Sequence, residues 1–85
     1  MYEVFYQQKA LKALQKLPRN LSRLIREKID QLAQDPHAPN PNVKLLEGRN
    51  GYRLRVGDWR ILCEVIDDRL VIVVVKIKTR GDAYK

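Results

Sequence analysis

Three arginines lie close together around one tight turn of the sequence. Arg53 and Arg55 precede the dipeptide Gly57-Asp58, and Arg60 follows it. Glycine at the first turn position favours a type II′ hairpin, which would place Arg55 directly opposite Arg60. Because side chains alternate across a strand, all three guanidinium groups would then share one face of the hairpin.

Like charges that face each other across a strand pair destabilise a sheet by up to about 1 kcal/mol. One explanation of this arginine face is a solvated surface on which long cationic side chains extend into water. The other is an anion site, because guanidinium forks bind phosphate through two hydrogen bonds. We favour the anion site, since strands on a solvated surface more often alternate the sign of their charges.

The apolar residues of the hairpin occupy its other face and should lie beneath helices. They are Tyr52, Leu54, Val56, Trp59, Ile61, Cys63 and Val65. Hydrophobic periodicity predicts the remaining elements. These are a strand over 2–6, helices from about Gln8 to Leu17 and from about Leu21 to Gln34, and strands at 52–56, 59–66 and 69–77. The chain is thus predicted to be one α+β domain over residues 1–85, in the order β-α-α-β-β-β. An N-terminal strand is followed by an antiparallel hairpin of two helices and then by a three-stranded antiparallel sheet, with the helices packed on one face of the sheet.

The last predicted strand is apolar on both faces, so we expect it to be central and covered on both sides. A two-residue turn at Asp67-Asp68 would add an apolar strip to the arginine face. The strip would consist of Leu62, Val73, Val75 and Ile77. His37, the single histidine, lies in a loop with three prolines, and we interpret it as an exposed spacer without a catalytic or metal-binding partner.

Composition narrows the function classes. The 85 residues carry a formal net charge of +7, which would attract polyanions or an acidic protein. A single cysteine, Cys63, excludes an internal disulfide and a cysteine metal cluster, and we expect no metal or cofactor. The longest apolar run, 70–75, is too short to cross a membrane, and no secretory signal is visible, so we expect a cytoplasmic protein.

Three segments of the sequence, which include the arginine hairpin, occur in a characteristic order. They are Lys44-Leu45-Leu46-Glu47-Gly48, then Gly51-Tyr52-Arg53-Leu54-Arg55-Val56-Gly57-Asp58-Trp59-Arg60-Ile61, then Arg80-Gly81-Asp82-Ala83-Tyr84. Together they resemble the RelE/ParE toxin superfamily, and the resemblance spans nearly the whole chain. Similarity to the RelE branch implies an enzyme that enters the ribosomal A site and cuts mRNA there without a metal, and that is blocked by a cognate antitoxin protein.

The resemblance also implies roles for individual residues. By position, Arg60 and Arg80 would stabilise the phosphate in the transition state, and Tyr84 would serve as general acid–base. Lys44, Arg53 and Arg55 would position the mRNA. Taken without the resemblance, Tyr84 is an ordinary exposed ring near the terminus, although it and Arg80 follow the strand that borders the arginine face.

Two positions depart from the family pattern. Thr79 stands where many relatives carry histidine or another polar base, and Gly81 where many carry a second arginine. The site is therefore poor in groups that transfer protons, which fits an enzyme whose substrate is distorted by the ribosome. Two alternatives remain open: a ParE-like inhibitor of DNA gyrase, and a basic module that binds RNA or an acidic protein without catalysis.

Overall fold

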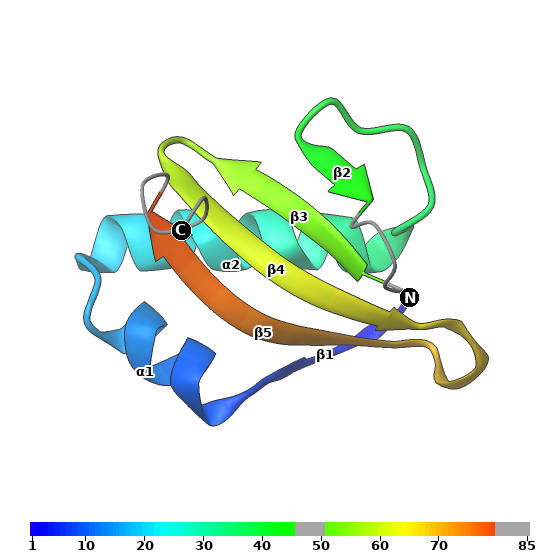
Figure 1. The fold of residues 1–85 in the computed structure, drawn as a ribbon, viewed down its shortest axis with the longest axis horizontal. Coiled ribbons are helices and arrows are strands. Elements are labelled where there is room, and N and C mark those ends of the chain that lie inside the picture. The colour runs from blue at the N-terminus through cyan, green and yellow to red at the C-terminus, as the bar shows by residue number, and fades with distance from the viewer. Residues whose placement is uncertain (46–50, 80–85) are drawn as a thin grey trace.

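The computed structural model describes residues 1–45 and 51–79 (Figure 1). Its elements are β1 (Glu3–Tyr6), α1 (Gln8–Gln15), α2 (Arg19–Gln34), β2 (Val43–Leu45), β3 (Gly51–Val56), β4 (Trp59–Ile66), a 3-10 turn (Asp67–Arg69) and β5 (Val71–Thr79). The predicted α+β class and element order are confirmed. The short strand β2 was not predicted, because three residues are too few to show a periodic pattern.

The strands form one five-stranded sheet in the order β1-β5-β4-β3-β2. β1 pairs with β5 in parallel, and the other neighbouring pairs are antiparallel, so the sheet is mixed rather than antiparallel as predicted. β5 was predicted to be central; it is an interior strand between β1 and β4, and β4 occupies the centre of the sheet. Cover on both sides of β5 is not observed, because Val71 and Val73 remain half-buried on the face away from the helices.

Both helices pack on one face of the sheet, and α2 runs behind β3 and β4 in Figure 1. Apolar residues at helical spacing explain this arrangement, since Ala10 and Leu14 of α1 and Ile25 and Ile29 of α2 are completely or almost completely buried. Pro18 separates the helices and occupies the N-cap position of α2, where no side-chain hydrogen bond caps the helix. Neither described helix is long and apolar enough to cross a membrane.

The hairpin between β3 and β4 has the predicted register. Arg55 pairs with Arg60, and the predicted apolar face is directed into the core. Gly57 has a φ of 58°. Asp58 is not among the described residues with positive φ, so the turn is of type II′, as predicted.

The hairpin between β4 and β5 differs from the prediction. Ile66 pairs with Val71, so the connection contains four residues rather than two. It is a 3-10 turn closed by Leu70, whose φ of 54° is left-handed. A two-residue turn at Asp67-Asp68 is disfavoured because type I′ geometry needs a positive φ at both positions, which suits Asn-Gly or Gly-Gly better.

A β-bulge near Leu62 and Cys63 changes the register of β5. Cys63 pairs with Val74, whereas Leu62 pairs with Lys76, which leaves Val75 as the extra residue. The side chains beyond the bulge therefore exchange faces. Ile77 lies in the core at 8% exposure, so its predicted position on the arginine face is wrong. Lys76 and Lys78 lie on that face instead.

We predict that Gly57→Ala lowers the free energy of unfolding by about 1–2 kcal/mol, because an L-residue is strained at positive φ. A Cβ atom added there would meet no atom within 4 Å, so the cost is conformational rather than steric. Urea unfolding at constant m-value measures it. Asp58→Ala, at the other turn position, is the control and should change stability by less than about 0.5 kcal/mol. An equal effect of both variants would contradict the turn assignment.

Candidate nucleic-acid interface

Basic side chains gather at one end of the sheet face opposite the helices, while Glu64, Val71 and Val73 occupy its other end. We call this surface the basic face and define it by Lys44, Arg53, Arg55, Arg60, Lys76 and Lys78. Arg55, Arg60 and Lys78 are direct partners on three consecutive strands. Lys44 and Arg53 form a second pair beside them. Such rows of like charge are unfavourable in a sheet unless an anion or solvent offsets them.

Arg60 is the one buried charged residue among those the structure describes, with 8% of its surface exposed. Its Nη1 donates to the carbonyl oxygens of Gly57 at 3.3 Å and Trp59 at 3.1 Å. Within residues 1–45 and 51–79, no carboxylate forms an ion pair with it. The guanidinium is therefore held in one orientation by the hairpin while its charge is not neutralised by an acidic side chain of that part of the chain.

A pocket opens beside Arg60 on the basic face. Its lining consists of Pro41, Asn42, Lys44, Arg53, Arg55 and Arg60. Asn42 holds Arg55 through two contacts: the Arg55 backbone N–H donates to the Asn42 carbonyl at 2.7 Å, and Arg55 Nη2 donates to Asn42 Oδ1 at 3.3 Å. A lining of four cations and one amide suits a phosphate group, which accepts hydrogen bonds from several donors.

The structure brings together the predicted residues Lys44, Arg53, Arg55 and Arg60. The predicted catalytic residues Arg80 and Tyr84 lie outside the described residues. Sequence reasoning missed Lys76 and Lys78, because alternation alone cannot reveal a bulge. The signal in the sequence that could have found them was the presence of two lysines just after the apolar run 70–75.

Cys63 is directed into the core, as predicted, and offers no nucleophile to this site. Burial raises the pKa of its thiol to about 12, so the thiol remains protonated at neutral pH. In the described part of the chain, no three His, Cys, Asp or Glu side chains are grouped closely enough to hold a metal ion.

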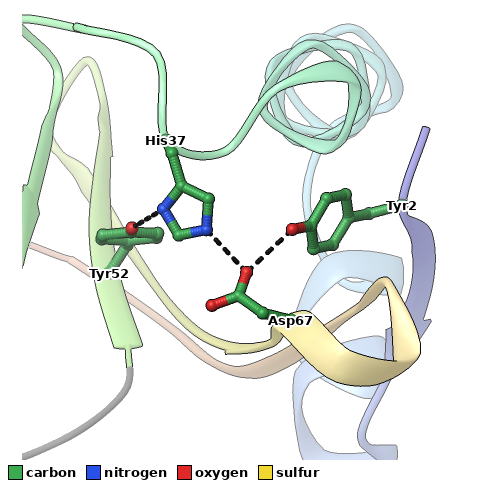
Figure 2. A network of polar contacts seen from close by, with 4 residues as sticks. All are labelled: Tyr2, His37, Tyr52 and Asp67. Carbon is green, nitrogen blue, oxygen red and sulfur yellow. Dashed lines mark hydrogen bonds and ion pairs between the residues drawn. The ribbon is translucent and has the colours of Figure 1, made fainter.

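His37 is exposed, as predicted, but it has hydrogen-bond partners and is therefore not an isolated spacer. Its Nδ1 lies 2.7 Å from the hydroxyl of Tyr52, and its Nε2 lies 2.6 Å from Oδ1 of Asp67. The Tyr2 hydroxyl donates to the same Oδ1 at 2.8 Å (Figure 2). These partners are 15 and 30 positions from His37 in the chain, so local sequence could not reveal them.

Comparison with known proteins places the fold and the basic face in a family. A family model described as the ParE toxin of the type II toxin-antitoxin system parDE matches residues 4–84. The chain belongs to the RelE/ParE toxin family. It is a RelE-like toxin of a toxin–antitoxin system.

Individual relatives agree with this assignment. A protein of Methanocaldococcus jannaschii described as toxin RelE1 is 31% identical over 99% of this chain and 96% of its own length. A protein of Escherichia coli described as a RelE-like toxin is 29% identical over 98% of this chain and 90% of its own. The crystal structure of the RelE–RelB complex from Pyrococcus horikoshii contains a chain that is 36% identical, with a TM-score of 0.82 over 94% of this chain and 96% of that one.

The row of like charges formed by Arg55, Arg60 and Lys78 leads to a prediction about Lys78, the residue opposite Arg60. Lys78→Gln should raise the free energy of unfolding of the toxin by a few tenths to about 1 kcal/mol, because it removes like-charge repulsion. The same variant should bind a short single-stranded RNA more weakly, with a salt slope reduced by about 0.7 for one lost phosphate contact. Urea unfolding and RNA titrations at several salt concentrations measure both effects. Arg23→Gln, on the exposed surface of α2, is the charge-matched control and should leave the salt slope unchanged.

The Asp67 contacts lead to a prediction about pH. Hydrogen bonds from His37 and then Tyr2 lower the pKa of the Asp67 carboxyl below its usual value near 3.9. The resulting stabilisation is complete above the unfolded pKa and is lost as the pH falls through the folded one. Asp67→Asn should therefore flatten the loss of stability below about pH 4. Unfolding at a series of pH values tests this, with Asp68→Asn as the neighbouring control; identical profiles for the two variants would refute it.

Proposed function

We propose that this toxin is an endonuclease that cuts mRNA in the ribosomal A site and so inhibits translation, and that a cognate antitoxin restrains it. The observation that carries the proposal is the buried, oriented Arg60 guanidinium in a pocket of cations that lies on an open sheet face. The Pyrococcus horikoshii relative, at 36% identity, forms a complex with RelB, which supports an antitoxin partner here. The proposed site of action implies a cytoplasmic protein.

The reaction is transesterification of RNA. The 2′-oxygen forms a bond to the adjacent phosphorus while the bond from phosphorus to the 5′-oxygen breaks. The 2′-hydroxyl proton passes to a base, and the leaving 5′-oxygen receives a proton, which gives a 2′,3′-cyclic phosphate and a 5′-hydroxyl. Negative charge grows on the non-bridging oxygens, and donors fixed in advance stabilise it most.

The residues of the basic face would have different roles in this reaction. Arg60 would oppose the growing charge, together with Arg80 from the terminal segment. Lys44, Arg53 and Arg55 would hold the flanking phosphates, as in other sites that recognise nucleic-acid backbones. Such guanidinium chemistry requires no metal ion or cofactor.

Proton transfer is the demanding part of the proposal. The described lining of the pocket contains cations, Asn42 and Pro41, and none of these is a general base at neutral pH. We assign acid–base work to Tyr84, whose usual pKa near 10 must be lowered by neighbouring cations for it to act as a base. A weak base suits an enzyme that acts only on mRNA already bent within the ribosome.

Inhibition of DNA gyrase is the second candidate. The observation in its favour is the matching family model, which is described as the ParE toxin. Against it, the two relatives described above with at least 30% identity are described as RelE proteins. Binding of RNA or an acidic protein without catalysis is the third possibility, and it would need only the charge of the basic face.

The deciding experiment adds purified toxin to a translation complex with defined mRNA in the A site, and maps cleavage by primer extension. We expect cuts with ribosomes and none in a parallel reaction with mRNA alone. Arg60→Gln should lower the cleavage rate by about 100-fold or more, the usual loss for one oriented donor. Arg19→Gln, which removes the same charge from the exposed start of α2, should cleave normally.

Other outcomes would redirect the assignment. Normal cleavage by folded Arg60→Gln would contradict the role of the pocket. Absence of cleavage in both reactions, together with inhibition of purified gyrase in a supercoiling assay, would establish the second candidate. RNA binding that weakens steeply with salt, without any cut product, would leave only the binding module.

A further inference from the structure

A proline-rich segment borders the basic face and is attached to β3 at two places. We call residues 35–42 the proline segment; it contains Pro36, Pro39 and Pro41 and connects α2 to β2 (Figure 1). His37 contacts Tyr52 at the start of β3, and Asn42 contacts Arg55 near its end. The segment therefore connects the two ends of β3 as an outer loop, while β2 itself pairs with β3 between them (Figure 1).

The attachment at His37 has one consistent hydrogen-bond pattern when the imidazole is neutral. The Asp67 carboxylate accepts from Tyr2 and can only accept from His37 as well, so Nε2 of the imidazole carries the proton in its neutral form. Nδ1 then accepts from the Tyr52 hydroxyl. Burial and the charge of Asp67 raise the pKa of Tyr52, which agrees with a phenol that keeps its proton. The His37 and Tyr52 rings also meet edge to face, 6.0 Å apart.

This network is not itself a catalytic triad. A carboxylate, an imidazole and a hydroxyl do follow one another in the order of such triads. Tyr52, however, is 9% exposed, and its raised pKa makes the phenolate harder to form. The network lies at the opposite end of β3 from Arg55. Its contacts instead join the proline segment, β3, the 3-10 turn and the residue before β1, as Figure 2 shows for the four side chains.

We propose that His37 is a positioning residue of the basic face, which it serves by fixing the proline segment so that Asn42 holds Arg55. Proline locks φ, and three prolines among eight residues leave the segment few internal degrees of freedom. The turn at Asn40, whose Oδ1 accepts from the Asn42 N–H at 2.9 Å, restricts it further. These restraints would couple the position of His37 to that of Asn42, the residue that directly precedes the pairing of Val43 with Leu54.

The consequence at the site concerns Arg55. Both its backbone N–H and its guanidinium donate to Asn42, so the position of Asn42 determines where the Arg55 charge lies in the pocket. Without the His37 contact, the two hydrogen bonds from Arg55 to Asn42 would break more often. The inference rests on the proposed function only where it concerns RNA; the contact between Asn42 and Arg55 can be measured by itself.

Hydrogen exchange of the Arg55 backbone amide tests the inference in the full-length protein. That amide is protected by the Asn42 carbonyl, so its exchange reports release of the segment. His37→Ala and Tyr52→Phe should each accelerate its exchange by roughly tenfold relative to Ile61 in the middle of β4, the effect of losing about one hydrogen bond. His37→Gln keeps a donor toward Asp67 and should be intermediate.

Tyr2→Phe is the matched control, because it removes a hydrogen bond from the same carboxylate but leaves both His37 contacts in place. It should leave the ratio of Arg55 to Ile61 exchange unchanged, even where global stability falls. A merely stabilising role of His37 would instead change both amides in proportion in every variant. If His37→Ala does not fold, Tyr52→Phe and His37→Gln decide the matter.

Binding of a short single-stranded RNA completes the test. His37→Ala should weaken it about threefold to tenfold, and Tyr2→Phe should not, since one partly ordered donor is affected. If Arg60→Gln binds RNA as well as the unchanged toxin does, the proposed function fails, while the exchange data still test His37. If Arg60→Gln loses affinity but Arg55 exchange is normal in His37→Ala and Tyr52→Phe, the role of His37 is overturned.

Discussion

Repulsion between Arg55, Arg60 and Lys78 is the constraint to which the rest of the structure responds. Three cations that are direct partners on adjacent strands oppose formation of the sheet that carries them. The backbone ladder, the tight turn at Gly57 and the apolar face beneath must therefore hold the strands together. Placing these charges side by side costs stability, as the residues of functional sites commonly do.

The hydrophobic core supplies the stabilisation that offsets the charge repulsion on the basic face. Leu54 and Ile61 lie directly beneath the arginine hairpin and are almost completely buried, as is Ile77 beyond the bulge. Helix α2 covers this side of the sheet with residues that are themselves inaccessible to solvent, among them Ile25 and Ile29. Burial of apolar area stabilises the fold by about 25 cal/mol per Å². One face of each strand is thus left free to carry charge, which alternation of side chains makes possible.

Local geometry then turns a charged surface into a site. Arg60 donates to two carbonyls of its own turn, so its guanidinium does not swing freely into water. Asn42 holds Arg55 from the other side of the pocket. A site assembled before its ligand arrives loses less conformational entropy on binding, and its charges need not reorganise during a reaction.

Sequence by itself determined the α+β class, the helical pair, the Arg55–Arg60 register and the face that the arginines occupy. These features follow from side-chain periodicity and turn chemistry, which act over a few neighbouring residues. Only the tertiary structure decided that a bulge places Lys78 beside Arg60, that Ile77 is buried, and that His37 has partners. A bulge arises from the fit between two strands and the core, and His37 meets Asp67 across 30 positions of chain, so no local pattern records either.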